Sequence, residues 1–131
     1  MTDSQKALIQ YRMERAREAL DEARLLAQAQ HWNACISRLY YACFYAVNAL
    51  LLSRGLSSAR HSGVRALFNR HFVKSGVIAH DLAACYSSLF DSRHESDYED
   101  LFRPDPAEVE LLREQARQFV EAIAVLLSPQ L

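Results

Sequence analysis

The segment Asp91–Tyr98 gathers more side chains that could do chemistry than any other part of this sequence. Arg93 could hold a phosphate, and His94 or Tyr98 could transfer a proton beside it. Arg93 also closes an apolar stripe at helical spacing, so its guanidinium should emerge at a groove. The alternative is a structural ion pair between Arg93 and Asp97, one helical turn apart, and the residues by themselves favour that alternative.

The rest of the chain gives little evidence for a metal site or for a catalytic nucleophile. Di-iron bundles need Glu-x-x-His on two helices, a pattern that does not occur here, and the five histidines are scattered singly. We therefore predict no metal site and no other cofactor. There is also no Gly-x-Ser-x-Gly motif and no Gly-rich phosphate loop. Cys35, Cys43 and Cys85 lie among apolar residues, which predicts buried thiols of raised pKa in a reducing compartment.

The elements that must position these residues are predicted to be helices. The chain has 131 residues, of which 50% are hydrophobic, and its three glycines and three prolines leave little room for the turns of an all-β fold. Apolar residues recur at helical spacing almost throughout. The predicted helices run from about Ser4 to Gln30, from Trp32 to Arg54, from Ser57-Ser58 to Ser75-Gly76, from His80 to beyond Leu89, and from an Asp105 N-cap through Pro106 to Leu127. This pattern predicts an all-α bundle of four to five helices in a single domain, residues 1–131.

The segment from Trp32 to Arg54 differs from the other predicted helices because it has almost no polar face. A helix that is apolar all round in a water-soluble chain should be the central one, packed on several sides. No uninterrupted apolar run reaches the roughly 18 residues of a membrane span. The polar N-terminus lacks the apolar core of a signal peptide, so we expect a cytosolic protein without membrane association.

Charge is distributed unevenly along the chain, although the net charge is only −1. Residues 23–80 carry seven basic and no acidic side chains, whereas residues 81–131 carry four basic and eleven acidic ones. The basic middle could bind a polyanion, or it could pair with the acidic end within one molecule or across a dimer. Arg60, Arg65 and Arg70 are expected to be solvated or paired with the acidic end.

Several blocks of this sequence together resemble a HEPN-domain protein (higher eukaryotes and prokaryotes nucleotide-binding). The blocks follow the family's order and are Ser37–Leu52, His61–Phe68, Phe72–Gly76 and Arg93–Tyr98. The Tyr-Tyr-Ala sequence of the central helix, the His-x-Gly turn and the Arg-x-x-x-Asp-Tyr ending suggest the small stand-alone prokaryotic branch.

The resemblance implies an antiparallel bundle, usually dimeric, often encoded beside a small nucleotidyltransferase as a toxin–antitoxin pair or a two-part transferase. Catalytic members are metal-independent ribonucleases in which an Arg stabilises the scissile phosphate and a His four to six residues beyond it moves a proton. Arg93 matches the motif arginine, and His94 falls in the polar slot. Tyr98 stands where the His is expected, and a phenol with a pKa near 10 is a poor general base at neutral pH.

The leading hypothesis is a HEPN-type homodimer that acts with a small nucleotidyltransferase and binds RNA or a nucleotide in a groove near Arg93. Its candidate catalytic residues, as an endoribonuclease, are Arg93, His94 and Tyr98. The alternative is a non-catalytic nucleotide-binding or scaffold subunit of a two-part nucleotidyltransferase.

The candidate ligand-binding residues are Tyr40, Tyr41, His61 and Asp97. Tyr40 and Tyr41 have an alternative role as core aromatics with a hydroxyl at a groove. His61 could contact a phosphate, or it could instead cap the third helix.

Overall fold

The fold of this chain is all-α, as the sequence predicts. A computed structural model describes residues 1–98 and 102–131, with Tyr98 described by its backbone only, and no strand occurs in this part of the chain. The elements are α1 (Asp3–Gln28), α2 (Trp32–Ser53), α3 (His61–Phe68), a π-helical turn η1 (Asn69–Val73), α4 (His80–Tyr98), α5 (Pro106–Leu127) and a short 3₁₀ turn η2 (Ser128–Gln130).

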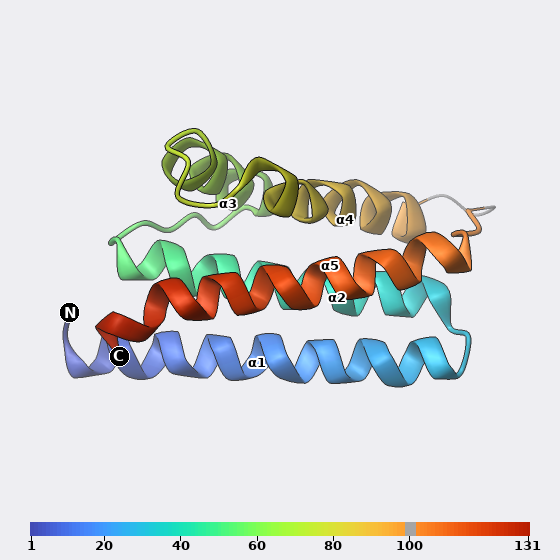
Figure 1. Cartoon of the computed structure of the whole chain (residues 1–131), viewed down its shortest axis with the longest axis horizontal. Coiled ribbons are helices and arrows are strands. Elements are labelled where there is room, and N and C mark those ends of the chain that lie inside the picture. Colours follow the sequence, from blue (N-terminus) through green and yellow to red (C-terminus); the bar gives the residue numbers. More distant parts are fainter. Residues whose placement is uncertain (99–101) are drawn as a thin grey trace.

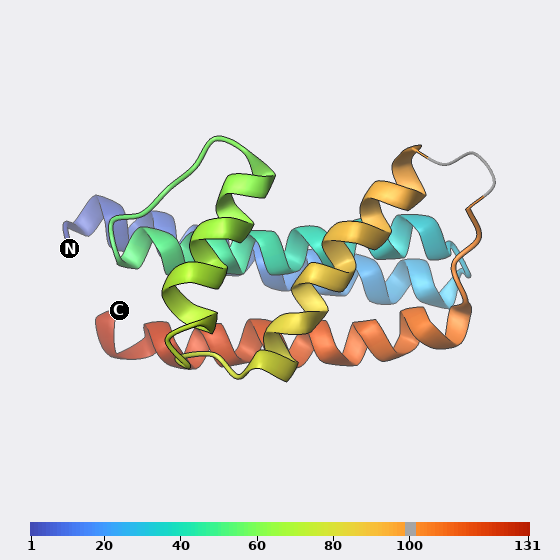
Figure 2. The ribbon, with the colours of Figure 1, turned by 90° about the horizontal axis from the view of Figure 1, so that it is seen from above.

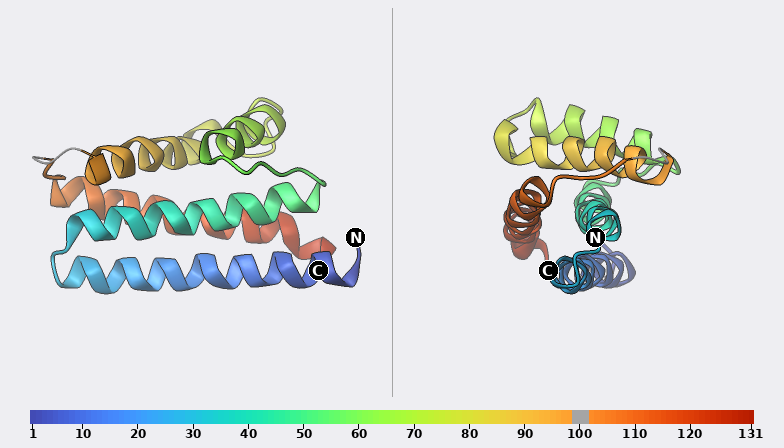
Figure 3. Two further views of the ribbon diagram at one scale, coloured as in Figure 1. Left: turned by 180° about the vertical axis from the view of Figure 1, so that it is seen from behind. Right: turned by 90° about the vertical axis from the view of Figure 1, so that its right-hand side faces the viewer.

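The helices form two layers. In one layer α1, α2 and α5 lie along the length of the molecule, with α2 and α5 running opposite to α1 (Figure 1). In the other layer α3 and α4 form a hairpin that crosses α2 and α5 obliquely (Figure 2). The end-on view in Figure 3 shows α3 and α4 covering one side of the three long helices. Both chain termini lie at the same end of the molecule (Figure 1).

Helix α2 is the central element, as its apolar composition predicts. It contacts each of the four other α-helices, and half of its residues are fully enclosed, among them Leu39, Tyr40 and Leu50. By length and composition alone α2 could cross a membrane, but most of its apolar window is buried inside the bundle. Its apolarity is explained by this central position.

Small side chains let α1 and α2 approach closely. Ala16, Ala19 and Ala23 of α1 are buried, α2 is the helix that α1 contacts most extensively, and the Cys35 thiol of α2 donates a hydrogen bond to the Ala23 carbonyl at 3.3 Å. All three cysteines are free and buried, as predicted. Burial raises the pKa of the Cys35 thiol to about 11, so this thiol is protonated and unreactive at neutral pH.

The start of the third helix was predicted wrongly. The first helical residue is His61, not Ser57 or Ser58, because the Ser58 hydroxyl accepts a hydrogen bond from the Arg60 amide at 3.3 Å and holds this stretch as a turn. Gly63 lies in the first turn of α3 rather than in a loop turn. A Cβ at Gly63 would collide with the Ser58 side chain, so glycine allows the turn to fold against the helix.

The ends of the other helices agree with the sequence signals. Gly55 and Gly76 adopt positive φ of 70° and 80° and end their helical segments, a conformation that costs glycine little. At the start of α5 the Asp105 carboxylate accepts a hydrogen bond from the Ala107 amide at 3.0 Å, with Pro106 in the first turn. The Asp105 cap therefore fixes the residue at which α5 begins, after the end of α4.

The Asp105 cap gives a prediction about stability. Replacing Asp105 by Ala leaves an amide of the first turn without its partner, and should lower the free energy of unfolding by about 1 kcal/mol. Asp105→Asn retains an acceptor and should stay within a few tenths of a kcal/mol of the parent. Urea denaturation followed by circular dichroism measures both variants. Equal stability of the Ala and Asn variants would contradict the role of the cap.

Candidate functional site

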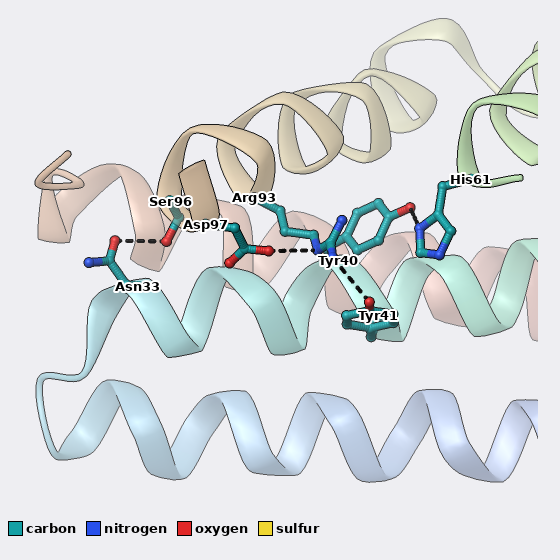
Figure 4. Close-up of polar contacts among 7 residues, drawn as sticks. All are labelled: Asn33, Tyr40, Tyr41, His61, Arg93, Ser96 and Asp97. Carbon is teal, nitrogen blue, oxygen red and sulfur yellow. Dashed lines mark hydrogen bonds and ion pairs between the residues drawn. The ribbon is translucent and has the colours of Figure 1, made fainter. Parts of the chain in front are cut away.

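The Arg93 side chain leaves α4 and lies across the surface of α2 (Figure 4). Its Nη2 donates a hydrogen bond to the Tyr41 hydroxyl at 3.2 Å, and its Nε lies 3.3 Å from Oδ2 of Asp97. The Cζ atom is 5.2 Å from the ring centroid of Tyr40 and 5.3 Å from that of Tyr41, which are cation–π distances. Two tyrosine rings and one carboxylate therefore hold the guanidinium in place.

These contacts leave part of the Arg93 donor capacity unused. The buried Nε makes no hydrogen bond, because the Asp97 carboxylate lies at ion-pair distance but off the N–H direction. Within the described part of the chain, Nη1 makes no hydrogen bond, and Nη2 bonds only to Tyr41. The side chain is 24% exposed. The ion pair predicted as the structural alternative is thus present, yet the guanidinium can still donate to an incoming anion.

Tyr40 and His61 form a second polar contact next to Arg93. The Tyr40 hydroxyl lies 2.7 Å from Nδ1 of His61, and it donates to that atom when the neutral ring carries its proton on Nε2. Burial raises the pKa of Tyr40 to about 12, an effect that the Arg93 charge partly opposes. Burial and the Arg93 charge both lower the pKa of His61. His61 is therefore neutral at pH 7, and it stacks on Phe44 with ring centroids 4.3 Å apart.

A pocket of about 360 Å³ opens beside the Arg93–Asp97 pair. It lies between the start of α2 and the end of α4, and its polar lining comes from Asn33, Ser37, Arg38, Ser96 and Asp97. The Ser96 hydroxyl donates to Oδ1 of Asn33 at 2.9 Å and joins the two helices across the pocket (Figure 4). Arg93 does not line this pocket, which it adjoins only through its ion-pair partner Asp97, so the groove predicted at Arg93 stays a prediction.

Two further arginine side chains lie over aromatic rings near the site, and the sequence did not identify either of them as a candidate site residue. Arg38 covers Tyr41 at 5.1 Å from its centroid, and Arg65 covers Phe90 at 3.9 Å. Arg65 was predicted to be either solvated or paired with the acidic end of the chain, and it is paired, because it lies 3.6 Å from Asp91. The available signal for Arg38 was its spacing of three residues before Tyr41, which places both on one face of a helix.

Comparison with known proteins identifies the family. The model of the HEPN domain matches residues 9–126, nearly the whole chain. The chain belongs to the HEPN domain family. This finding agrees with the resemblance carried by the tyrosine-rich central helix and the Arg93–Tyr98 segment.

Close relatives of this HEPN protein are also small. A UPF0332 protein of Thermotoga maritima is 41% identical over 127 residues, which cover 97% of this chain and 96% of the relative. A protein of Methanocaldococcus jannaschii named "Putative toxin MJ0605" is 31% identical over 88% of this chain and 85% of its own. The crystal structure of TT1696 from Thermus thermophilus has the same fold, with a TM-score of 0.73 over 88% of this chain and 95% of its own at 18% identity.

The predicted catalytic residues of this HEPN protein all lie near the end of α4. Arg93 points to α2, where it contacts the Tyr41 hydroxyl (Figure 4). His94 is exposed, and one residue along an α-helix turns a side chain by about 100°, away from the direction of Arg93. Tyr98 is the last residue of α4, and its side chain lies outside the described part of the structure. The catalytic assignment of these residues stays a prediction.

The four predicted ligand-binding residues lie around Arg93, and each makes a different contact. Tyr40 is fully buried, so it acts as a core aromatic whose hydroxyl binds His61. Tyr41 is half-buried and accepts from Arg93, and Asp97 pairs with Arg93. The capping alternative for His61 is wrong. His61 is the first residue of α3 and its side chain turns to Tyr40, while the N-cap position belongs to Arg60 without a side-chain cap bond.

Within residues 1–98 and 102–131, no group of three or more His, Cys, Asp or Glu side chains is placed to hold a metal ion.

The lowered pKa of His61 predicts a pH dependence of stability. As the pH falls, the unfolded chain takes up a proton on this histidine before the folded chain does, so folding stability is lost below the unfolded pKa of about 6.5. His61→Asn retains an acceptor for Tyr40 but does not titrate. Between about pH 7.5 and 5.5 the wild type should lose more Tm than this variant.

The matched control for this experiment is His71→Asn, which replaces an exposed histidine of η1. The control should retain the pH slope of the wild type. If His61→Asn has the same slope as the wild type, the buried Tyr40–His61 contact does not control the titration.

Proposed function

We propose that this HEPN protein binds RNA, or a nucleotide, through the Arg93 guanidinium in the groove between α2 and α4. The observation that carries the proposal is the state of Arg93. Its guanidinium is held in place by the rings of Tyr40 and Tyr41 and by the Tyr41 hydroxyl, its Nη1 makes no hydrogen bond in the described part of the chain, and its ion-pair partner Asp97 lines a pocket of about 360 Å³. An oriented guanidinium of this kind is suited to bidentate binding of a phosphate.

The Asp97 carboxylate is the main obstacle to an anion at this position. Its side chain is 36% exposed, and it approaches Nε at 3.3 Å without a directed hydrogen bond. Partly exposed ion pairs contribute only about 0–1 kcal/mol. A phosphate that accepts two hydrogen bonds from Arg93 can therefore displace Asp97 toward solvent, or share the guanidinium with it.

The reaction that fits these groups is metal-independent RNA cleavage. The ribose 2′ oxygen attacks the phosphorus, its proton goes to a base, and the 5′ oxygen leaves with a proton from an acid, which yields a 2′,3′-cyclic phosphate. Arg93 would stabilise the charge on the phosphate. His94 and Tyr98 are the candidates for moving protons, with the two copies of Arg93 brought together in a homodimer.

The toxin name of the Methanocaldococcus relative supports a role in a toxin–antitoxin pair. We infer that the partner is a small nucleotidyltransferase encoded nearby and that the pair acts in the cytoplasm, where free thiols such as those of Cys35, Cys43 and Cys85 persist.

A specific observation favours a second function. Arg93 already pairs with a carboxylate of its own chain, and Tyr98 occupies the place where catalytic family members have a histidine. Both features suit a non-catalytic nucleotide-binding or scaffold subunit of a two-part nucleotidyltransferase. In this role Arg93 would bind its ligand without cleaving it.

Incubation of the purified protein with labelled RNA in EDTA tests the proposal. The wild type should cleave the RNA, and Arg93→Ala should reduce the rate by about 10²- to 10³-fold, as expected for loss of a donor to the reacting phosphate. Tyr98→Phe tests the phenol as proton donor and should slow cleavage if it serves in that role. Arg117→Ala is the matched control, because Arg117 pairs with Glu114 on the exposed side of α5, and it should cleave normally.

The possible results separate the two functions. If no form cleaves RNA but Arg93→Ala loses binding, the non-catalytic function is supported. If Arg93→Ala cleaves and binds as well as the wild type, the proposed site is wrong. Circular dichroism of each variant verifies that the fold is retained.

A further prediction concerns assembly. Light scattering should give twice the mass of one chain, and a co-expressed nucleotidyltransferase from the neighbouring reading frame should elute in a complex with the dimer. A monomer at micromolar concentration, or separate elution of the two proteins, would contradict the proposed assembly.

A further inference from the structure

The structure divides the basic side chains of residues 23–80 into two groups. Arg24, Arg38 and Arg65 each lie 3.6 Å from a carboxylate of the same chain. The others are exposed and make no ion pair with any acidic side chain that the structure describes; they are Arg54, Arg60, Arg70 and Lys74. Pairing within the molecule therefore accounts for only part of the basic middle of the chain.

Three of these unpaired side chains lie where α2 ends. The Cζ atom of Arg54, the residue after α2, is 5.6 Å from the ring centroid of Phe72 in η1. Arg70 belongs to the same π turn, and Lys74 follows it by four residues in helical conformation, so these two side chains share one side of the turn. Figure 1 shows α3, which runs into η1, next to this end of α2. We refer to Arg54, Arg70 and Lys74 as the basic corner.

The stability of the bundle gives no reason for this gathering of charge. Residues 23–80 contain no acidic side chain, and the first one after the corner is Asp81, in the first turn of α4. Asp81 makes no ion pair with the corner. Like charges four residues apart destabilise a helix, so Arg70 and Lys74 act against the turn that carries them.

The basic corner presents donors that suit phosphate groups. Arg54 lies over the Phe72 ring, and no hydrogen bond of its side chain occurs within residues 1–98 and 102–131. A guanidinium held by its flat face keeps its N–H donors in its own plane, free for an anion. Lys74 adds a compact charge that binds phosphate from any direction.

An RNA strand fits this surface better than an acidic protein does. Protein interfaces have a core of apolar and aromatic side chains. Between residues 54 and 80, Val77 is the one large apolar side chain that is exposed, at 43%. A surface of separate cations with so little apolar area is suited to a chain of separate phosphates.

The distance from Arg93 also favours a strand over a single nucleotide. The basic corner lies near the start of α4, and Arg93 lies near its end. From His80 to Arg93 the helix rises by about 20 Å, at roughly 1.5 Å per residue. Figure 2 shows α4 running away from the end of the α3 segment over this length. A ligand that contacts both places must therefore be a polymer.

We propose that the basic corner binds the phosphate backbone of RNA at a second place, outside the Arg93 groove and without reading the bases. This inference rests on the proposed function and names RNA, rather than a nucleotide, as its ligand. Cations that neutralise phosphates release counterions from the strand, so the affinity falls as the salt concentration rises. The steepness of this fall counts the contacts.

Fluorescence anisotropy with a labelled 2′-O-methyl oligouridine, measured over a series of NaCl concentrations, tests the corner. This probe cannot be cleaved through its 2′ oxygen. Arg70→Gln and Lys74→Gln together should make the plot of log binding constant against log salt shallower by about 1.4, since each phosphate contact on a single strand contributes about 0.7. Arg54→Gln should make it shallower by about 0.7. Both variants should bind more weakly than the wild type at low salt.

Arg17→Gln is the matched control. Arg17 is exposed on α1 and makes no ion pair among the described residues, but Glu14 and Asp21 each lie one turn away from it. This variant removes the same charge and should keep the wild-type slope. Arg70→Lys retains the charge and should also keep it. Because the corner variants relieve repulsion, their Tm should equal or exceed that of the wild type, which separates lost binding from lost folding.

The outcomes distinguish this inference from the proposed function. If Arg93→Ala loses binding while the corner variants keep the wild-type slope, RNA binds at Arg93 and the inference is wrong. If the corner variants flatten the slope while Arg93→Ala binds like the wild type, the corner binds RNA and the proposed function fails.

Three further results would overturn the inference. Arg17→Gln could flatten the slope as much as the corner variants, which would show that net charge alone controls binding. The corner variants could bind RNA normally but lose co-elution with the co-expressed nucleotidyltransferase, which would make the corner a protein interface. A wild type that binds no RNA would contradict both proposals.

Discussion

The burial of α2 is the constraint on which the rest of this structure depends. A helix with apolar residues on nearly every side must be covered, and here α1, α5 and the α3–α4 hairpin each cover part of it. Fully enclosed side chains such as Leu39 and Leu50 show how complete this cover is. The two-layer arrangement, with the hairpin crossing the long helices, follows from the need to enclose one central element (Figures 1 and 2).

The candidate site occupies the face of α2 that the other helices leave partly open. Along this face the exposed surface is aromatic, and guanidiniums cover the rings where no helix does. Arg93 covers the rings of Tyr40 and Tyr41, and its Nη1 makes no hydrogen bond in the described part of the chain. In the proposed function the cation that covers these rings would also bind the anion, and the rings themselves would orient it.

Much of this arrangement could be predicted from the sequence, and the parts that could not share a physical cause. The helix caps at Asp105 and the glycine stops at Gly55 and Gly76 are local interactions, so local sequence predicted them correctly. The start of α3 was predicted too early. The Ser58 hydroxyl accepts a hydrogen bond from the Arg60 amide and holds a turn there, and the spacing of apolar residues gives no sign of this bond. The role of His61 depended on Tyr40, which lies on another helix.

The sequence by itself determined the all-α class, the central position of α2, the buried cysteines and the ion pair between Arg93 and Asp97, because these follow from composition and from spacing along one helix. The tertiary structure alone decided which rings Arg93 covers, that His61 turns to Tyr40 rather than capping its helix, and that Arg15 of α1 covers Tyr45 of α2. These contacts join residues of different helices, and the angle and register at which helices pack depend on the whole core rather than on either segment.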